Sequence, residues 1–236
     1  RSLCDWSSDV CSSDLFPAFL KMLSSINVDV WGLSDSSLTC KPGDIFFAIS
    51  GTKVDAKEFA LDAVKRGAVA IVSNVKLNLP KNVANVVCKN DRKAMSYISA
   101  SFYGFPSKEL FIVGVTGTNG KTTSTFMLES IFKNAGKKVG IIGTNGVFVS
   151  GEKIVTNMTT PDPIVLQNVL AIMRDNGVQV VCMEISAHAL ELQKNLGVMT
   201  DIALFTNLTQ DHLDFFLNMQ NYYKAKAKLF TPENAI

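Results

Sequence analysis

Short apolar runs alternate with amphipathic stretches along most of the chain. Between residues 26 and 104, apolar runs predict strands, and apolar positions spaced three and four apart predict helices. The predicted strands are 45–49, 68–72 and 83–88, and the predicted helices are 57–66 and 91–103. The segment Gly104-Phe105-Pro106-Ser107 then breaks the pattern. Because Gly and Pro favour turns, we place a domain boundary there.

A second alternation begins at residue 110. The predicted strands are 110–115, 139–142, 178–183 and 202–206, and the predicted helices are 121–134 and 163–176. Spacing in the first helix places Met127, Leu128, Ile131 and Phe132 on its inward face. Strands that are apolar on both faces and separated by helices predict an α/β fold with a covered parallel sheet. Ligands in such folds bind at the carboxyl ends of the strands.

Composition narrows the function classes. Hydrophobic residues make up 47% of the 236 residues and charged residues 19%, which predicts a sizeable core and excludes a disordered chain. The net charge of +2 implies no basic surface, so we expect no nucleic-acid partner. We find neither a run of roughly 18–20 apolar residues nor a signal peptide. We therefore expect a cytoplasmic protein without a membrane partner.

The two ends of the sequence are unusual. Residues 1–15 read RSLCDWSSDVCSSDL, with a near-repeat and two of the five cysteines. This stretch resembles a translated sequencing adapter, so we leave it out of the fold prediction; the alternative is a disordered N-terminal tail. At the other end, TPENAI follows a helical pattern without a closing element. We expect the chain to be a fragment.

A glycine-rich loop lies between the predicted strand 110–115 and the predicted helix 121–134. It reads Gly117-Thr118-Asn119-Gly120-Lys121-Thr122-Thr123. Glycines let backbone N–H groups approach phosphates, and a helix N-terminus adds partial positive charge. Lys121 can reach the terminal phosphates, and the Thr122 hydroxyl can bind Mg²⁺. The strict G-x-x-x-x-G-K-[ST] pattern is not met, because Val115 stands where its first Gly would fall. The context still predicts nucleoside triphosphate binding.

Two further turns carry polar residues after predicted strands. Glu184 follows the strand 178–183, where a carboxylate beside a phosphate loop can bind Mg²⁺. His212 follows the strand 202–206. Alone, such a histidine is more often a residue at a helix start, but two such turns flanking the loop favour a functional role. Lys224, Lys226 and Lys228 alternate further on, and their spacing by itself predicts a solvated basic face.

These segments together resemble the Mur ligases, which form amides with ATP during peptidoglycan synthesis. The matching segments are GTNGKTT (117–123), TTP (159–161), EISAHAL (184–190), NLTQDHLD (207–214) and YYKAKAKLF (222–230). With SDSSLTCKPGDIFFAISG (34–51), they most resemble the MurE type, which adds a diamino acid to UDP-N-acetylmuramoyl-L-alanyl-D-glutamate (UDP-MurNAc-L-Ala-D-Glu). The resemblance covers residues 26–236.

The resemblance implies a domain organisation. Residues 16–107 would be the UDP-substrate-binding domain, and residues 108–236 an incomplete central ATP-binding domain with a parallel sheet. The C-terminal domain that brings the amino acid would be absent. We expect a monomer whose cofactors are ATP and Mg²⁺ and whose partners are the UDP-MurNAc dipeptide and a diamino acid.

The resemblance also assigns roles to residues. It implies that Gly117, Thr118, Asn119, Gly120, Lys121, Thr122 and Thr123 bind ATP. It implies a catalytic group of Lys121, Glu184, His212 and Lys226, with Mg²⁺ held by Thr122, Glu184, His212 and Lys226. Lys226 matches a lysine that the family carbamylates, which turns a cation into a carboxylate-like anion. It implies that the substrate is bound by Ser36, Thr52, Lys53, Val54, Thr159, Thr160, Ser186 and Lys194.

Four positions depart from the family pattern. The usual D-S-R reads Asp35-Ser36-Ser37, and E-x-S-S-H contains Ala187 in place of a serine. A substrate-side arginine appears as Lys194, which cannot form a bidentate fork, and a frequent glutamine is Leu192. All four concern the substrate side and leave the ATP and Mg²⁺ residues unchanged.

Two alternative functions remain open. A folylpolyglutamate-synthase-like ligase would share the ATP loop, although residues 26–104 would then have no role. A non-catalytic nucleotide-binding fragment is the other. The sequence does not distinguish lysine, meso-diaminopimelate or another amine as the added residue.

Overall fold

The computed structural model describes residues 29–49, 56–149, 151–154 and 159–234. The chain forms two compact units, residues 1–101 and 102–236. In the described ranges, no helix is both long and apolar enough to cross a membrane. The cysteines of these ranges, Cys40, Cys88 and Cys182, are buried and unpaired.

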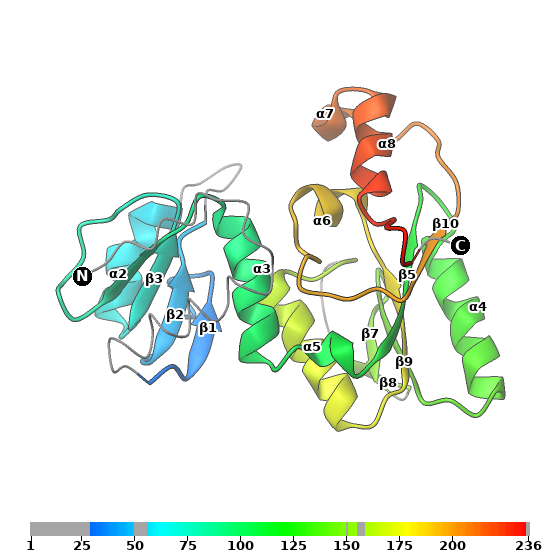
Figure 1. Ribbon diagram of the computed structural model, residues 1–236, viewed down its shortest axis with the longest axis horizontal. Helices are drawn as coiled ribbons and strands as arrows, with labels where there is room; N and C mark the ends of the chain where they lie inside the picture. The colour runs from blue at the N-terminus through cyan, green and yellow to red at the C-terminus, as the bar shows by residue number, and fades with distance from the viewer. Residues whose placement is uncertain (1–28, 50–55, 150, 155–158, 235–236) are drawn as a thin grey trace. The chain divides into compact units, whose positions relative to one another are not determined.

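The first unit contains a parallel four-stranded sheet in the order β1-β2-β3-β4 (Figure 1). The strands are β1 (Gly32–Ser34), β2 (Asp44–Phe47), β3 (Ala70–Ser73) and β4 (Ala84–Val87), and the helices are η1 (Ala56–Phe59), α2 (Ala60–Lys65) and α3 (Asp91–Phe102). Phe46 and Ile71 pack against Ala60 and Ala63 of α2. Strand β1 was not predicted, because three residues that include a glycine give too short an apolar pattern.

The second unit contains a six-stranded sheet in the order β10-β5-β9-β6-β7-β8. Its strands are β5 (Phe111–Thr116), β6 (Val139–Gly143), β7 (Gly146–Val149), β8 (Glu152–Ile154), β9 (Val180–Glu184) and β10 (Ile202–Phe205). Its helices are η2 (Pro106–Lys108), α4 (Lys121–Asn134), α5 (Pro163–Asp175), α6 (Ala187–Glu191), α7 (Leu213–Phe216) and α8 (Met219–Ala227). The predicted α/β fold is confirmed.

The sheet of the second unit is mixed, unlike the parallel sheet that was predicted. Strands β10, β5, β9 and β6 are parallel, but β7 and β8 pair antiparallel at one edge. Only Thr144 and Asn145 join the paired residues Gly143 and Gly146 of β6 and β7. A link of two residues can form a hairpin but cannot form the crossover that a parallel neighbour requires.

Helices α4 and α5 cover opposite faces of this sheet, as Figure 1 shows. Alternation along the strands sends Ile112 and Val181 toward α5, and Val113 and Cys182 toward α4. The bounds of α4 match the prediction, but its inward face is narrower.

The prediction that Met127 and Ile131 face the core is wrong. They are 62% and 61% exposed, whereas Leu128 and Phe132 pack against the sheet. Residues four apart share one stripe of a helix, and the stripe of α4 that packs against the sheet is the one that contains Leu128 and Phe132.

Candidate active site at the strand ends

The sheet order of the second unit brings the three predicted turns together with the link that follows β6. Because β10, β5, β9 and β6 are parallel neighbours, their carboxyl ends lie along one edge. The segments that follow them contain Asn207, Gly117, Ile185 and Thr144, respectively. Helices α6, α7 and α8 gather at one end of this unit (Figure 1), with α8 packed against α6 and α7.

The loop of residues 117–120 joins β5 to α4 and depends on its glycines. Gly117 has φ +145° and Gly120 has φ +85°. A Cβ on Gly117 would overlap Oγ1 of Thr206 and lie 3.0 Å from the backbone nitrogen of Asn207. The loop therefore lies tightly against the segment that follows β10. The first N–H groups of α4 have no acceptor within the helix, so they remain for an anion.

Asn207 fixes the shape of the loop. Its carbonyl accepts from Thr118 N at 2.9 Å, its Oδ1 accepts from Asn119 N at 3.0 Å, and its Nδ2 donates to Asn119 O at 3.1 Å. Thr206 adds a bond from Oγ1 to Asn119 O at 2.6 Å. These bonds hold residues 118 and 119 without using the N–H groups at the start of α4.

Lys121 folds back over the loop. Its Nζ donates to the carbonyls of Gly117 and Thr118 at 2.9 and 2.8 Å. Burial lowers the pKa of Lys121, and the negative charges of Glu184 and Asp211 oppose that shift. The ammonium group thus lies above the loop with two carboxylates in electrostatic range.

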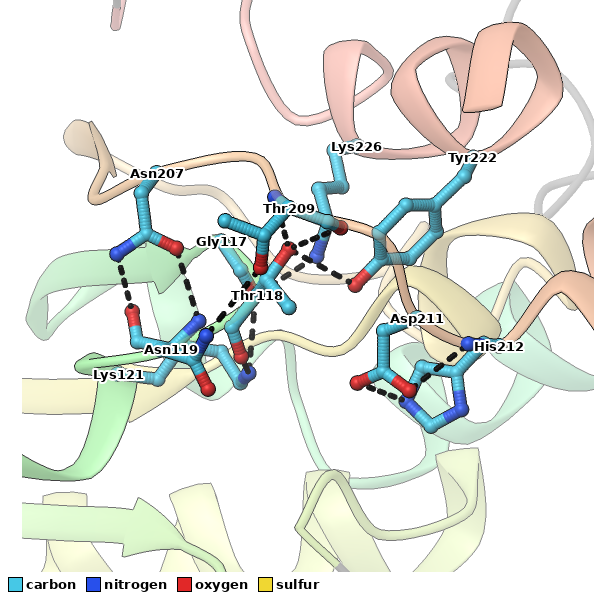
Figure 2. Close-up of polar contacts among 10 residues, drawn as sticks. All are labelled: Gly117, Thr118, Asn119, Lys121, Asn207, Thr209, Asp211, His212, Tyr222 and Lys226. Carbon is cyan, nitrogen blue, oxygen red and sulfur yellow. Dashed lines mark hydrogen bonds and ion pairs between the residues drawn. The ribbon is translucent and has the colours of Figure 1, made fainter. Parts of the chain in front are cut away.

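Lys226 approaches the same loop from α8, as Figure 2 shows. Its side chain is 1% exposed, and Nζ donates to the Gly117 carbonyl at 2.7 Å. The ammonium also lies 4.4 Å from the centre of the Tyr222 ring. Burial and the positive charge of Lys121 lower the pKa of Lys226 to about 8, with Asp211 acting against the shift. The spacing-based reading of Lys226 as solvated is therefore wrong.

Glu184 ends β9 and is 1% exposed. Thr144 donates to both of its oxygens, from the backbone N to Oε1 at 3.0 Å and from Oγ1 to Oε2 at 3.1 Å. The sequence analysis did not identify Thr144 as a partner of Glu184. Among the described residues, no Lys, Arg or His nitrogen lies within 4.0 Å of the Glu184 carboxylate. A buried carboxylate without a cationic partner is costly unless a cation joins it.

The donor set around the loop suits Mg²⁺. Glu184 offers a buried carboxylate and Thr122 a hydroxyl, and Mg²⁺ prefers oxygen ligands. Within the described ranges, no three His, Cys, Asp or Glu side chains gather closely enough to hold a metal by themselves. Mg²⁺ is usually held by one or two carboxylates, and phosphates and waters complete its ligand set.

His212 is the residue before α7 (Leu213–Phe216) and has a left-handed backbone, φ 52°. Its Nε2 lies 3.4 Å from Oδ2 of Asp211, and its ring lies edge-on to that of His188 at 4.8 Å. Burial and the neighbouring His212 lower the pKa of His188. Figure 2 shows His212 beside Asp211, below Tyr222 in the view.

Three of the four predicted substrate residues of the second unit lie near Glu184. Thr159 Oγ1 lies 3.0 Å from Thr144 Oγ1. Thr160 Oγ1 donates to the Glu184 carbonyl and accepts from Ser186 N, both at 3.1 Å. Ser186 caps α6, because its Oγ accepts from Ala189 N at 3.1 Å.

Lys194 and Ser36 also have partners. Lys194 Nζ lies 2.7 Å from Oδ1 of Asp162, the residue before α5. Ser36 follows β1, and its carbonyl accepts from Thr39 N and Cys40 N at 3.2 and 3.1 Å. The remaining predicted substrate residues, Thr52, Lys53 and Val54, lie outside the described residues.

Comparison with known proteins gives consistent matches. The chain is 45% identical over 204 residues to UDP-N-acetylmuramoyl-L-alanyl-D-glutamate--2,6-diaminopimelate ligase of Geobacillus thermodenitrificans (strain NG80-2), covering 86% of the chain and 41% of that protein. The chain thus spans about two fifths of the length of such relatives. The 204 residues exceed the length of the second unit, so the match extends into the first.

Solved structures agree. A structure of a UDP-N-acetylmuramoyl-L-alanyl-D-glutamate--2,6-diaminopimelate ligase superposes with a TM-score of 0.74 and 30% identity, covering 85% of this chain and 40% of that one. MurF ligase from Thermotoga maritima in complex with ADP has a TM-score of 0.56 at 20% identity, covering 89% and 45% of the two chains. The second of these supports the fold alone.

The family assignment rests on the second unit. The sequence pattern of the Mur ligase middle domain matches residues 115–235, which begin in β5 and include the loop, Glu184, His212 and Lys226. The chain belongs to the Mur ligase family.

Proposed function

We propose that this chain carries the UDP-substrate-binding and ATP-binding parts of a MurE-type ligase, in residues 16–107 and 108–236. The observation that carries the proposal is the convergence of Lys121 and Lys226 on the Gly117 carbonyl. Glu184 lies on the strand next to β5. Two amino groups and a carboxylate therefore lie around the loop to which we assign phosphate binding.

The reaction joins an acid to an amine in two steps. In the first, an oxygen of the D-glutamate side-chain carboxylate attacks the γ-phosphorus of ATP, and the bond to the ADP oxygen breaks. In the second, the amino nitrogen of a diamino acid attacks the resulting acyl phosphate. Phosphate leaves and the nitrogen loses a proton. The product is an amide, and the energy comes from one ATP.

The chain's contribution to the first step is mainly electrostatic. The carboxylate and the triphosphate are both anions, so their approach is opposed by repulsion. Lys121 and the N–H groups at the start of α4 offset that repulsion at the phosphates. A bound Mg²⁺ would supply further positive charge, and Thr122, Glu184 and His212 are the residues that we assign to it.

Lys226 fits a role as a carbamylated ligand. Carbamylation requires a neutral amine, since its nitrogen attacks CO₂ and then releases a proton. A pKa of about 8 makes a neutral fraction available near physiological pH. The product would carry a negative charge beside Lys121, where the unmodified side chain brings a second positive charge.

Three of the proposed substrate residues, Thr159, Thr160 and Ser186, lie within two hydrogen bonds of Glu184. We assign Thr159, Thr160, Ser186 and Lys194 to the sugar-peptide, together with Ser36, Thr52, Lys53 and Val54 of the first unit. Lys194 would meet a substrate carboxylate as a single point charge, because lysine lacks the planar fork of arginine. Its ion pair with Asp162 holds its side chain at the start of α5.

The test is amide formation by the complete gene product. With UDP-MurNAc-L-Ala-D-Glu, Mg²⁺ and ATP, we expect ADP release to require both the dipeptide and a diamino acid. Comparing lysine with meso-diaminopimelate identifies the amine. A folylpolyglutamate-synthase-like function is favoured if the protein binds no UDP-sugar peptide and uses a folate instead. Nucleotide binding without any turnover would favour the non-catalytic alternative.

A further inference from the structure

The carboxylate of Glu184 depends on one neighbour. Thr144, in the two-residue link between β6 and β7, donates to Oε1 from its backbone nitrogen and to Oε2 from its hydroxyl. Gly143 lies close to the same carboxylate, because a Cβ there would overlap Oε1 and lie 2.8 Å from Cδ of Glu184. The position of both carboxylate oxygens thus depends on the two hydrogen bonds from Thr144 and on the lack of a side chain at Gly143.

The hydroxyl of Thr144 lies between two oxygens. It is 3.1 Å from Oε2 of Glu184 and 3.0 Å from Oγ1 of Thr159. An ionised carboxylate only accepts hydrogen bonds, and a hydroxyl has a single proton. The Thr144 proton therefore goes to Glu184, and the Thr159 proton goes to Thr144. The result is a directed chain from Thr159 through Thr144 to Glu184.

Thr160, which follows Thr159 in the chain, holds the end of β9 through backbone atoms of Glu184 and Ser186. Thr160 donates to the Glu184 carbonyl and accepts from Ser186 N. The two oxygens that this bond joins, Thr160 Oγ1 and the Glu184 carbonyl oxygen, are buried. Consecutive threonines therefore reach Glu184 by two routes, and only the route through Thr144 touches its carboxylate.

We propose that Thr144 is a positioning residue that links the substrate segment at Thr159 to the metal-binding carboxylate of Glu184. This inference rests on the proposed roles of Glu184 and Thr159. A substrate that takes up the Thr159 hydroxyl changes the hydrogen bond that Thr144 accepts, and so the strength of its donation to Glu184. Linkage then requires the metal to change substrate affinity by the same factor as the substrate changes metal affinity.

The test uses the complete enzyme with Mn²⁺ as the metal probe and a non-hydrolysable ATP analogue. Free Mn²⁺ is measured by electron paramagnetic resonance, without and with UDP-MurNAc-L-Ala-D-Glu. Thr144→Val removes the hydroxyl but keeps the backbone donor, and Thr144→Ser keeps both. We expect Thr144→Val to weaken Mn²⁺ binding by about 10-fold, the effect typical of groups that orient a ligand. Thr144→Ser should stay within about 2-fold of the wild type.

The second readout is the coupling between dipeptide binding and Mn²⁺ affinity, which a merely structural role of Thr144 would not change. In the wild type, the dipeptide should shift the Mn²⁺ affinity, and in both Thr144→Val and Thr159→Val that shift should vanish. The melting temperature of each variant reports general damage. Equal effects of Thr144→Val and Thr144→Ser, or a lowered melting temperature with unchanged Mn²⁺ affinity and coupling, would overturn the inference.

Glu184→Gln separates this inference from the proposed function. If Glu184→Gln leaves Mn²⁺ affinity unchanged, the assigned role of Glu184 is wrong and the inference falls with it. If Glu184→Gln weakens Mn²⁺ binding but Thr144→Val does not, Glu184 keeps its role and the positioning role of Thr144 is rejected.

Discussion

Lys121 and Lys226 donate hydrogen bonds to the same oxygen, the Gly117 carbonyl, at 2.9 and 2.7 Å. One lysine begins α4 and the other lies in the last turn of α8. Two ammonium groups this close repel each other, and burial removes the water that would screen them. The more buried of the two, Lys226, therefore has the pKa with the larger shift, to about 8.

The first prediction concerns the pH at which Lys226 reacts with CO₂. Its folded-state pKa lies below the ordinary value, so the neutral amine becomes abundant at lower pH than in an exposed lysine. At pH 8 roughly half of such side chains are neutral, against well under 1% of ordinary lysines. With ¹³C-labelled CO₂ at fixed pressure, the carbamate NMR signal of Lys226 should appear at lower pH than that of any surface lysine. Lys226→Ala identifies the signal, and its persistence in that variant would contradict the assignment.

A second prediction follows for the function of that carbamate. Lys226→Ala removes the proposed anion, and we expect most of the activity of the complete enzyme to be lost. Short carboxylates such as formate or acetate should restore part of it, because they can place an anion in the vacated space. Lys224→Ala is the matched control, since Lys224 is exposed on the same helix and should need no rescue. Lack of any rescue counts against carbamylation.

The third prediction concerns Lys121. Replacing it by Ala removes the charge above the loop, and we expect a rate loss of over about 10²-fold, the scale of losing one preorganised donor. Lys137→Ala, which removes an exposed lysine beyond the end of α4, should leave the rate unchanged. Steady-state kinetics of the complete enzyme measure both, and a near-wild-type rate for Lys121→Ala would refute its role.

Much of this arrangement could be predicted from sequence because it depends on local signals. The loop, the helix after it and the strands beside it follow from glycine positions and runs of apolar residues. The same rule could have identified Thr144, since that residue follows the predicted strand 139–142 just as Glu184 follows the strand 178–183. It was missed because threonine after a strand is too common to be a signal alone.

Other features depend on contacts that no local pattern encodes. The exposure of Met127 and Ile131 depends on which stripe of α4 meets the sheet. The burial of Lys226 depends on where α8 packs, because its sequence spacing matches that of Lys224 and Lys228, which are not buried. Similarly, the bonds of Asn207 to the loop join segments almost 90 residues apart.

The fourth prediction tests the close approach at Gly117. Ala at this position would have φ +145° and a Cβ that overlaps Thr206 Oγ1, with the Asn207 backbone 3.0 Å away. We expect Gly117→Ala to lower the free energy of unfolding by about 2 kcal/mol or more and to weaken ATP binding. Gly136→Ala is the control, because Gly136 also has positive φ, +75°, but a Cβ there meets nothing within 4 Å. Denaturant unfolding of both variants separates the backbone strain that they share from the clash that only Gly117→Ala creates.

The last prediction concerns a substitution that displaces the carboxylate of Glu184 and leaves that residue itself unchanged. Gly143 ends β6, and a Cβ there would overlap Oε1 of Glu184. Since Thr144 holds the carboxylate from one side, Gly143→Ala should push it out of place and raise the Mg²⁺ concentration needed for half-maximal activity, by about 10-fold. Gly140→Ala is matched to it, because Gly140 lies on the same strand and its Cβ would press on the flexible side chain of Met173, 2.7 Å away at Sδ. Gly140→Ala should lower the melting temperature while the Mg²⁺ requirement stays unchanged. If both variants raise that requirement equally, the effect comes from distortion of β6, and the carboxylate position is not what controls metal binding.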